Sequence, residues 1–309
     1  MRVAMLGGTG AMGGLYGARL AEGGCDVALV DVNREAVERV SRSGLRIEAA
    51  GEATAYTVPA TTDASTVGVV DVVIVFVKCY DTVEAVRAAS PMIGDDTVVL
   101  SLQNGWGNAP RIADIVGADR VAIGVSYHSA TAVGPGHIQH AGTGKTFLGE
   151  LDGGVSKRVT RIAGALNNAG MEAEATDQVL RQVWSKLSLN VCTLPTSAVL
   201  RFTADQLIAD ENVRELMREI LAEAVAVANA RDIPLDFDER WATITDILTR
   251  AVGGKASMLQ DVENKRRTEI DVISAAVSEM GAEAGIATPY NETMTLLVKT
   301  IEDAYFADE

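Results

Sequence analysis

Residues 3–13 read Val-Ala-Met-Leu-Gly-Gly-Thr-Gly-Ala-Met-Gly, and this stretch indicates the fold of the first half of the chain. The apolar run Val3–Leu6 predicts a buried strand, and the pattern Gly8-Thr9-Gly10-Ala11-Met12-Gly13 follows it almost at once. Glycines at this spacing permit a tight turn, a close approach of backbone to a pyrophosphate, and close packing of the next helix on the strand. Phosphate oxygens are then bound by N–H groups at the N-terminus of that helix. The stretch therefore predicts a dinucleotide-binding Rossmann domain, with residues 8–13 contacting the cofactor.

A second apolar run, residues 26–31, ends in the carboxylate of Asp31, 18 residues after Gly13. A carboxylate at this position accepts hydrogen bonds from ribose hydroxyls and repels a 2′-phosphate. Arg34 lies close enough in the sequence to favour the phosphorylated cofactor, and Asp31 as a plain turn residue is the alternative to a cofactor role. NAD is therefore favoured, with NADP as the second possibility.

The first half of the chain alternates short β-branched runs with helical stretches, which predicts a parallel sheet with crossover helices. Runs that are apolar throughout suit strands covered on both faces. The further strands are expected at residues 72–77, 97–102 and 171–175, and the helices at residues 12–22, 34–41, 82–91 and 156–169.

From residue 177 onward the pattern is almost entirely helical, and Pro234 and Pro289 fall where helices must stop or start. The expected helices cover residues 178–194, 203–230, 238–251, 258–285 and 291–307. We therefore predict an α/β protein in two parts: a dinucleotide-binding Rossmann domain over residues 1–176 and an all-helical substrate and catalytic domain over residues 177–309.

The net charge of the 309-residue chain is −15, because 42 acidic residues outnumber 27 basic ones. That field repels polyanions, so we expect no nucleic-acid partner. The longest apolar run, residues 67–77, is interrupted by Asp71 and is too short to span a bilayer. The glycine loop also begins without a leader-like segment before it, so we expect a cytoplasmic protein with no membrane partner.

Two patterns that point to other functions are rejected. Residues 141–146 resemble the end of a P-loop, but Gln139 stands where its first glycine belongs, and a strand-like run follows instead of a helix. His137 and His140 lie three residues apart in a turn-and-strand context that aims them apart, and no carboxylate or cysteine completes a metal site. We expect no bound metal, and we interpret the three cysteines as buried thiols.

Residues 184–190, Trp-Ser-Lys-Leu-Ser-Leu-Asn, put Lys186 and Asn190 on one face of a helix. A lysine among apolar neighbours is costly to bury without a task or a partner, although a lysine that extends to solvent is the alternative. Ser257, Asp261 and Glu269 are expected on one long helical stretch, either as site residues or as a solvated face.

The chain resembles the ketopantoate reductase family over essentially its full length. The matching segments are residues 8–17, 77–78, 102–105, 135–140, 184–190, 257–261, 268–271 and 288–291. The resemblance implies a Rossmann domain, a helical domain, and reduction of a 2-oxo acid by a nicotinamide cofactor, with ketopantoate and pantothenate biosynthesis as the default. The long helical half offers surface for a homodimer, which we expect.

The resemblance also assigns roles to single residues. Lys186 matches the family's proton donor to the substrate carbonyl, and Glu269 matches the acidic partner in the same pocket. Asn104 matches the residue that helps to hold that lysine and the nicotinamide region, and Lys78 matches a lysine near the cofactor phosphates. Hydride addition to a ketone creates an alkoxide, which an ammonium group stabilises and then protonates. Burial lowers the pKa of such a lysine and Glu269 raises it, and the sequence leaves open which effect wins.

The sequence departs from the family near the substrate. Asn190 and Ser257 match substrate-binding positions, but Leu194-Pro195 stands where the family usually has Asn-Pro, which removes a polar group that normally faces substrate. Ile273-Ser-Ala replaces the usual Ile-Asn-Gly, and many members carry an arginine at the position of Asp31.

Three functions remain open: a ketopantoate reductase, the same chemistry on a less polar 2-oxo acid, and a dinucleotide sensor without turnover. Lys186, Asn104 and Glu269 argue against the sensor, which needs only the glycine loop and Asp31.

Overall fold

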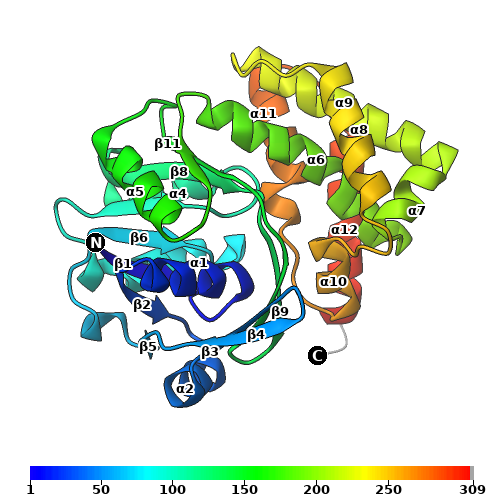
Figure 1. Cartoon of the computed structure of the whole chain (residues 1–309). Coiled ribbons are helices and arrows are strands. Elements are labelled where there is room, and N and C mark those ends of the chain that lie inside the picture. Colours follow the sequence, from blue (N-terminus) through cyan, green and yellow to red (C-terminus); the bar gives the residue numbers. More distant parts are fainter. Residues whose placement is uncertain (307–309) are drawn as a thin grey trace. The chain divides into compact units, whose positions relative to one another are not determined.

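In a computed structural model of the chain, residues 1–306 are described, and the chain divides into two compact units (Figure 1). The first unit comprises residues 1–103 and 108–180. The second comprises residues 104–107 and the chain from Arg181 onward. Within the described residues, no helix combines the length and the apolar character needed to cross a membrane.

The first unit is built on an eight-stranded sheet with the order β12-β11-β8-β7-β6-β1-β2-β5. Its strands are β1 (Arg2–Leu6), β2 (Asp26–Val30), β5 (Ala60–Thr61), β6 (Val72–Val75), β7 (Val98–Ser101), β8 (Val121–Ser126), β11 (Thr146–Glu150) and β12 (Ala173–Ala175). Neighbours pair in parallel except β8 and β11. From β5 to β8 the strands follow the Rossmann order 3-2-1-4-5-6. Leu6 pairs with both Val30 and Val75, so the loops after β1, β2 and β6 meet at one edge.

The helices of this unit are α1 (Ala11–Glu22), α2 (Arg34–Ser43), α3 (Thr82–Ala88), α4 (Asn108–Val116) and α5 (Lys157–Asn168). A second sheet, which the sequence did not predict, has the order β4-β3-β10-β9. Its strands are β3 (Leu45–Ala49), β4 (Glu52–Tyr56), β9 (Ser129–Gly134) and β10 (His137–Gly142). Helix α1 lies between the two sheets, because a side chain at Gly17 would meet Leu29 of the large sheet and one at Gly14 would meet Ile138 of the small one.

The second unit is helical, as expected. Its elements are α6 (Val179–Leu200), which begins two residues before the unit, α7 (Ala204–Ala209), α8 (Glu211–Ala230), α9 (Phe237–Arg250), α10 (Ser257–Glu263), the 3₁₀ turn η5 (Ile270–Val272), α11 (Ser274–Ala284) and α12 (Pro289–Phe306). The fold class, a Rossmann-type sheet followed by helices, is therefore confirmed.

Three of the expected helix limits are wrong. Helix α6 does not stop at Leu194 but continues to Leu200 with Pro195 inside it; the proline removes one backbone hydrogen bond, and the helix goes on through the buried residues 196–198. Residues 203–230 form two helices, since the Asp210 carboxylate accepts the Val213 N–H (3.0 Å) and so starts a new one.

The expected helix over residues 258–285 is also divided. Helix α10 ends at Glu263, and Lys265 adopts a left-handed φ of 53°, which no α-helix accommodates. Glu269 therefore does not share a helix with Ser257 and Asp261, but lies just before η5. The expected end of the last helix, Ala307, lies outside the described residues.

Candidate cofactor and catalytic sites

The glycine loop leaves the end of β1 and leads directly into α1. Gly10 is the N-cap of α1, and no side chain caps this helix, so its first N–H groups are available to an anion. A Cβ at Gly13 would lie 2.2 Å from the carbonyl oxygen of Gly7, so only glycine permits this approach. The N–H groups of Gly7 and Gly8 donate to the Val30 carbonyl at 3.0 and 3.1 Å, which fixes the loop to β2. This geometry fits a bound pyrophosphate.

The Asp31 carboxylate holds the same loop from the end of β2. One oxygen accepts the N–H of Thr9 (2.9 Å) and the other accepts the N–H of Asn33 (3.0 Å). Each carboxylate oxygen can accept a further hydrogen bond, so these contacts leave capacity for a ribose hydroxyl. The turn role and the cofactor role that the sequence left open are therefore compatible.

A cavity of about 530 Å³ lies beside Asp31 at this edge of the sheet. Leu6, Val30 and Val77 are among the residues that form its apolar walls. Four carboxylates also line it: Asp31, Asp63, Asp81 and Glu84. Apolar walls suit an adenine ring and carboxylates suit ribose hydroxyls, so the cavity fits the adenosine half of a dinucleotide. Lys78 directly follows Val77 at the same edge.

Gln103 has a structural role at this edge of the large sheet that was not predicted from the sequence. Its side-chain amide donates to the Val77 carbonyl (2.8 Å) and to Thr82 Oγ1 (2.7 Å), and its oxygen accepts from Ser101 Oγ (3.0 Å). Gln103 thereby joins the loops that follow β6 and β7. Its signal in the sequence is a polar residue placed directly after a buried strand.

Residues 104–107 leave the first unit and belong to the helical one. The Trp106 N–H donates to the Val272 carbonyl at 2.8 Å. Gly105 has a φ of +79°, and a Cβ there would lie 2.1 Å from the same oxygen. This contact brings Asn104 into the unit that holds Glu269, three residues before Val272.

The second unit also contains Lys186, on α6. Burial lowers the pKa of Lys186 to about 8, against the opposing effect of the Glu269 carboxylate, so burial is the stronger of the two effects that the sequence left open. Glu269 is itself only 8% exposed. An ammonium group with this pKa is charged at neutral pH and gives up its proton readily.

One face of α6 carries the side chains that the sequence assigned to proton transfer and substrate binding. Asn190, which is buried, lies one turn after Lys186, and Leu194 lies one turn further along the same face. Ser257, by contrast, is exposed at the start of α10. The structure thus brings Lys186, Asn190, Asn104 and Glu269 into one unit and leaves Ser257 at its surface.

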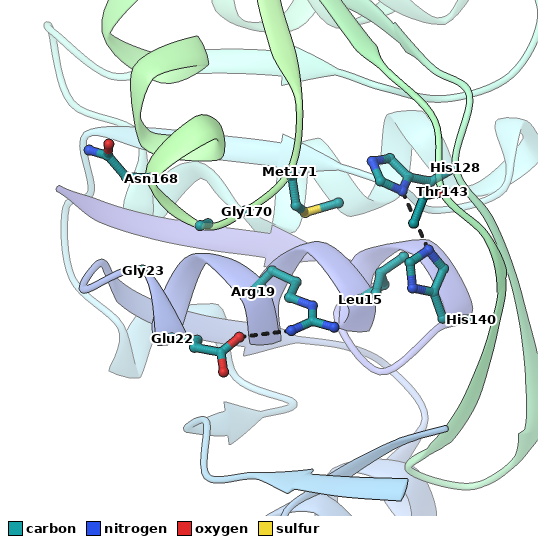
Figure 2. A pocket seen from close by; sticks show the side chains of 11 residues that line it. Leu15, Arg19, Glu22, Gly23, His128, His140, Thr143, Asn168, Gly170 and Met171 are labelled. Atoms are coloured by element: carbon teal, nitrogen blue, oxygen red, sulfur yellow. Dashed lines mark hydrogen bonds and ion pairs between the residues drawn. The ribbon is translucent and has the colours of Figure 1, made fainter. Parts of the chain in front are cut away.

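A separate cavity of about 390 Å³ lies along the C-terminal half of α1 (Figure 2). It is lined by Arg19, which is paired with Glu22 (2.9 Å), and by His128 and His140, whose Nδ1 and Nε2 atoms lie 3.4 Å apart. Burial, the other imidazole and Arg19 lower the pKa of His128 to about 4, and burial also lowers that of His140.

His137 and His140 therefore have different neighbours. His140 lies beside His128, whereas His137 Nε2 lies 3.4 Å from Glu48 Oε2. Over residues 1–306, no three His, Cys, Asp or Glu side chains gather as metal ligands would.

Solved structures with the same fold include a dehydrogenase with NADH and a ketopantoate reductase. D-mandelate dehydrogenase with NADH and anilino(oxo)acetate superposes with a TM-score of 0.92 and 29% identity, covering 98% of this chain and 99% of that one. A PanE/ApbA family ketopantoate reductase from Ralstonia eutropha gives a TM-score of 0.90 and 32% identity, with coverage of 98% and 99%. The Rossmann sheet, the glycine loop and these neighbours define a nicotinamide-dependent oxidoreductase.

Sequence comparisons narrow that class. The model "Ketopantoate reductase PanE/ApbA" matches residues 5–153, and its C-terminal counterpart matches residues 178–302. The 2-dehydropantoate 2-reductase of Halobacterium salinarum is 34% identical, covering 97% of this chain and 98% of the relative, and that of Archaeoglobus fulgidus is 32% identical, covering 96% of each. The chain belongs to the ketopantoate reductase family.

Proposed function

We propose that the protein reduces a 2-oxo acid to the 2-hydroxy acid with NADH, and that Lys186 is the general acid. The observation that carries this proposal is the lysine itself. Its pKa is lowered to about 8 by burial, it lies under the influence of Glu269, and it occupies the position of the family's proton donor. A dinucleotide sensor needs no such group.

The proposed reaction consists of one hydride and one proton transfer. When bound by the glycine loop and Asp31, the nicotinamide cofactor would supply a hydride to the carbonyl carbon of the 2-oxo acid. The Lys186 ammonium stabilises the negative charge that develops on the carbonyl oxygen and then transfers its proton to that oxygen. Glu269 favours the charged lysine before transfer, and Asn190 binds the substrate one turn along α6. Asn104 helps to hold the lysine.

NAD is the proposed cofactor. Support comes from Asp31 and from the three further carboxylates that line the cavity beside it. A 2′-phosphate placed among four carboxylates is repelled, whereas ribose hydroxyls donate hydrogen bonds to them.

A specific observation favours a second candidate substrate, a 2-oxo acid less polar than ketopantoate. Leu194 lies on the face of α6 that carries Lys186 and Asn190, where the family usually has asparagine. A structural neighbour, D-mandelate dehydrogenase, was solved with anilino(oxo)acetate, which carries an aromatic group. Both facts agree with a substrate that has an apolar side chain.

Steady-state assays with NADH test the function. The panel is ketopantoate, the 2-oxo acid that corresponds to mandelate, and straight and branched aliphatic 2-oxo acids. We expect turnover of at least one member, and we expect an apolar member to exceed ketopantoate in kcat/KM. If ketopantoate is clearly the best substrate, the protein is a ketopantoate reductase in the strict sense. NADH binding without turnover of any member would contradict the proposal in favour of a sensor.

We also propose that the protein is a homodimer, supported by the surface that the long helices of the second unit offer. Sedimentation equilibrium is expected to give twice the mass of 32.5 kDa. A mass of one chain at micromolar concentration would contradict this.

A further inference from the structure

Arg240 on α9 is an almost fully buried arginine, with 9% of its surface exposed. Its Nε–H donates to Ser188 Oγ at 3.1 Å, and its Nη2–H donates to the Ser185 carbonyl at 2.9 Å. Ser188 Oγ donates to the same carbonyl at 2.8 Å. Removing a guanidinium from water is costly, and hydrogen bonds to its N–H groups must offset that cost; two of the bonds that Arg240 makes go to one helix, α6.

The two serines flank Lys186 in the sequence but lie on another side of α6. Each residue advances about 100° around a helix, so Ser188 lies about 200° from Lys186. By the same count Ser185 lies about 140° from Asn190. Arg240 therefore holds the back of the helix, while Lys186 and Asn190 project from its front.

Two hydrogen bonds from one planar guanidinium to positions i and i+3 restrict a helix in two ways. They fix its rotation about its own axis, and they fix its position along that axis. The direction of the Lys186 side chain depends on both. Since a displacement of about 1 Å at a reacting group costs about a hundredfold in rate, this restraint bears on catalysis.

We propose that Arg240 is a positioning residue for Lys186: it fixes the rotation of α6 and so directs the lysine at the substrate carbonyl. This inference rests on the proposed role of Lys186 as proton donor. Arg240 acts through the helix and does not touch substrate.

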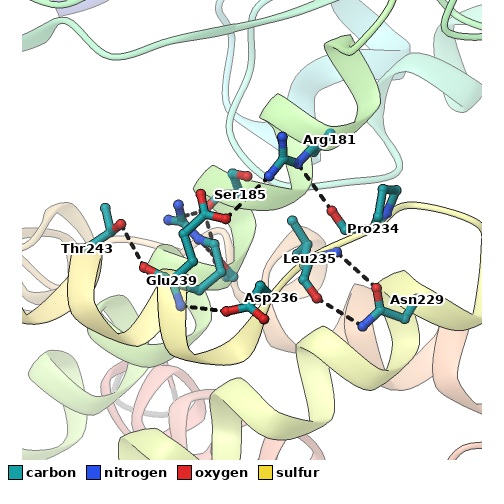
Figure 3. A network of polar contacts seen from close by, with 10 residues as sticks. Arg181, Ser185, Asn229, Pro234, Leu235, Asp236, Glu239 and Thr243 are labelled. Carbon is teal, nitrogen blue, oxygen red and sulfur yellow. Dashed lines mark hydrogen bonds and ion pairs between the residues drawn. The ribbon is translucent and has the colours of Figure 1, made fainter.

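The chain offers a matched control in Arg181, which also links α6 to the segment around α9 (Figure 3). Its Nε–H donates to the Pro234 carbonyl (3.2 Å), and its Nη2 lies 3.4 Å from Glu239. The Arg181 side chain is 40% exposed. Arg181→Ala therefore removes an arginine and two contacts from the same helix without changing what holds Ser185 and Ser188.

The experiment compares Arg240→Ala, Arg240→Lys and Arg181→Ala in the full chain, with NADH and the best 2-oxo acid of the wild type. We expect kcat of Arg240→Ala to fall about tenfold to a hundredfold, with the KM for NADH within about twofold of wild type. Guanidinium at low millimolar concentration should restore part of that kcat, because it refills the site left by the truncated side chain. It should not raise the kcat of wild type or of Arg181→Ala, which itself keeps near-normal turnover.

Arg240→Lys keeps the charge but loses the planar fork, and we expect a smaller fall in kcat in a protein that stays folded. If Arg240→Ala does not fold, the test uses Arg240→Lys and Ser188→Ala instead. The proposal is supported if the kcat of these two variants is below that of Arg181→Ala, and it is overturned if the kcat values are equal. It is also overturned if Arg240→Ala lowers the melting temperature while kcat per folded molecule stays within about threefold of wild type, or if guanidinium gives no rescue. Should Lys186→Ala itself keep its turnover, the proposed function fails, which is a separate result.

Discussion

Asp31 is the residue on which the choice of cofactor depends in this account. Asp31→Arg removes a carboxylate from the acidic cavity and adds a cation, so the kcat/KM ratio of NADH to NADPH should narrow or reverse. The variant also loses the contact to the Thr9 N–H, so a fall in activity with both cofactors is expected alongside the change in ratio. Asp31→Asn removes the charge and keeps one acceptor oxygen, which can still accept the Thr9 N–H, so it separates the loss of charge from the loss of that contact. Equal use of NADH and NADPH by the wild type would show that Arg34 governs the pocket.

Lys186 determines the expected pH dependence. With Lys186 as the proposed general acid, reduction needs its protonated form, so kcat/KM should be level below a pH of about 8 and fall about tenfold per unit above it. Oxidation of the 2-hydroxy acid needs the neutral form of Lys186, so kcat/KM for oxidation should rise with pH and become level above the pKa of this lysine. In Glu269→Gln the carboxylate that raises this pKa is absent, so the midpoint should move to lower pH. Rates of reduction that stay level from pH 6 to 10 are the result that contradicts a lysine donor.

At the scale of elements, the segment after β7 is held by a contact that only glycine allows. In Gly105→Ala the new Cβ meets the Val272 carbonyl, and the φ of +79° is strained as well. The free energy of unfolding should fall by about 1–3 kcal/mol because of this strain. The kcat should also fall, because Asn104 is displaced. Gly285→Ala is the control: its φ is +70° but the space around it is open, so it should cost about 1 kcal/mol and leave kcat unchanged. Equal effects of the two variants on stability and kcat would refute the account of this contact.

Helix α6 sets the second expectation at this scale, since Leu194 lies on the same face as Lys186 and Asn190. Leu194→Asn returns the family's amide and should improve ketopantoate relative to an apolar 2-oxo acid by about tenfold to a hundredfold in kcat/KM, the value of roughly 1–3 kcal/mol for one buried hydrogen bond. Leu200→Asn, at the exposed end of the same helix, should leave the ratio unchanged. If the ratio of kcat/KM for ketopantoate to that for the apolar 2-oxo acid is unchanged in Leu194→Asn, the substrate does not contact this face of α6.

Elements whose signal is local could be predicted from the sequence. The apolar run of β1, the glycine loop and α1 lie within 22 residues and fall close to their expected limits. The second sheet was missed because β4 is almost entirely exposed and alanine- and threonine-containing, so it has neither an apolar run nor a clear alternation. The division after Glu263 was missed because no glycine or proline marks it, and Lys265 takes the left-handed conformation instead.

In the candidate site, too, only the features with a local signal could be predicted from the sequence. Lys186 and Asn190 could be paired from their spacing on one helix. The contact that brings Asn104 into the helical unit joins Trp106 to Val272, residues far apart in the sequence, and has no local signal. The proposed role of Arg240 likewise depends on contacts with a helix more than fifty residues earlier.

At the scale of the whole molecule, the residues proposed for cofactor binding and for proton transfer lie in different units of the chain. The glycine loop and the acidic cavity belong to the first, and Lys186, Glu269 and Asn104 belong to the second. Cofactor binding and proton transfer should therefore be separable by substitution. NADH at about a hundred times its Kd should stabilise the protein by about 2.7 kcal/mol, in wild type and in variants of the second unit alike. Thermal unfolding with and without NADH measures this. Loss of the stabilisation in Lys186→Ala would contradict the separation.

The most direct test of Lys186 as general acid is one preparation of Lys186→Ala, with NADH affinity by fluorescence titration and kcat on the best 2-oxo acid measured side by side. Lys299→Ala, a lysine of the same unit that is paired with Asp271 at 2.7 Å, is the control. We expect Lys186→Ala to bind NADH within about twofold of wild type, while its kcat falls by roughly a hundredfold to ten-thousandfold. Lys299→Ala should change neither. If Lys186→Ala keeps more than about a tenth of wild-type kcat, Lys186 is not the proton donor.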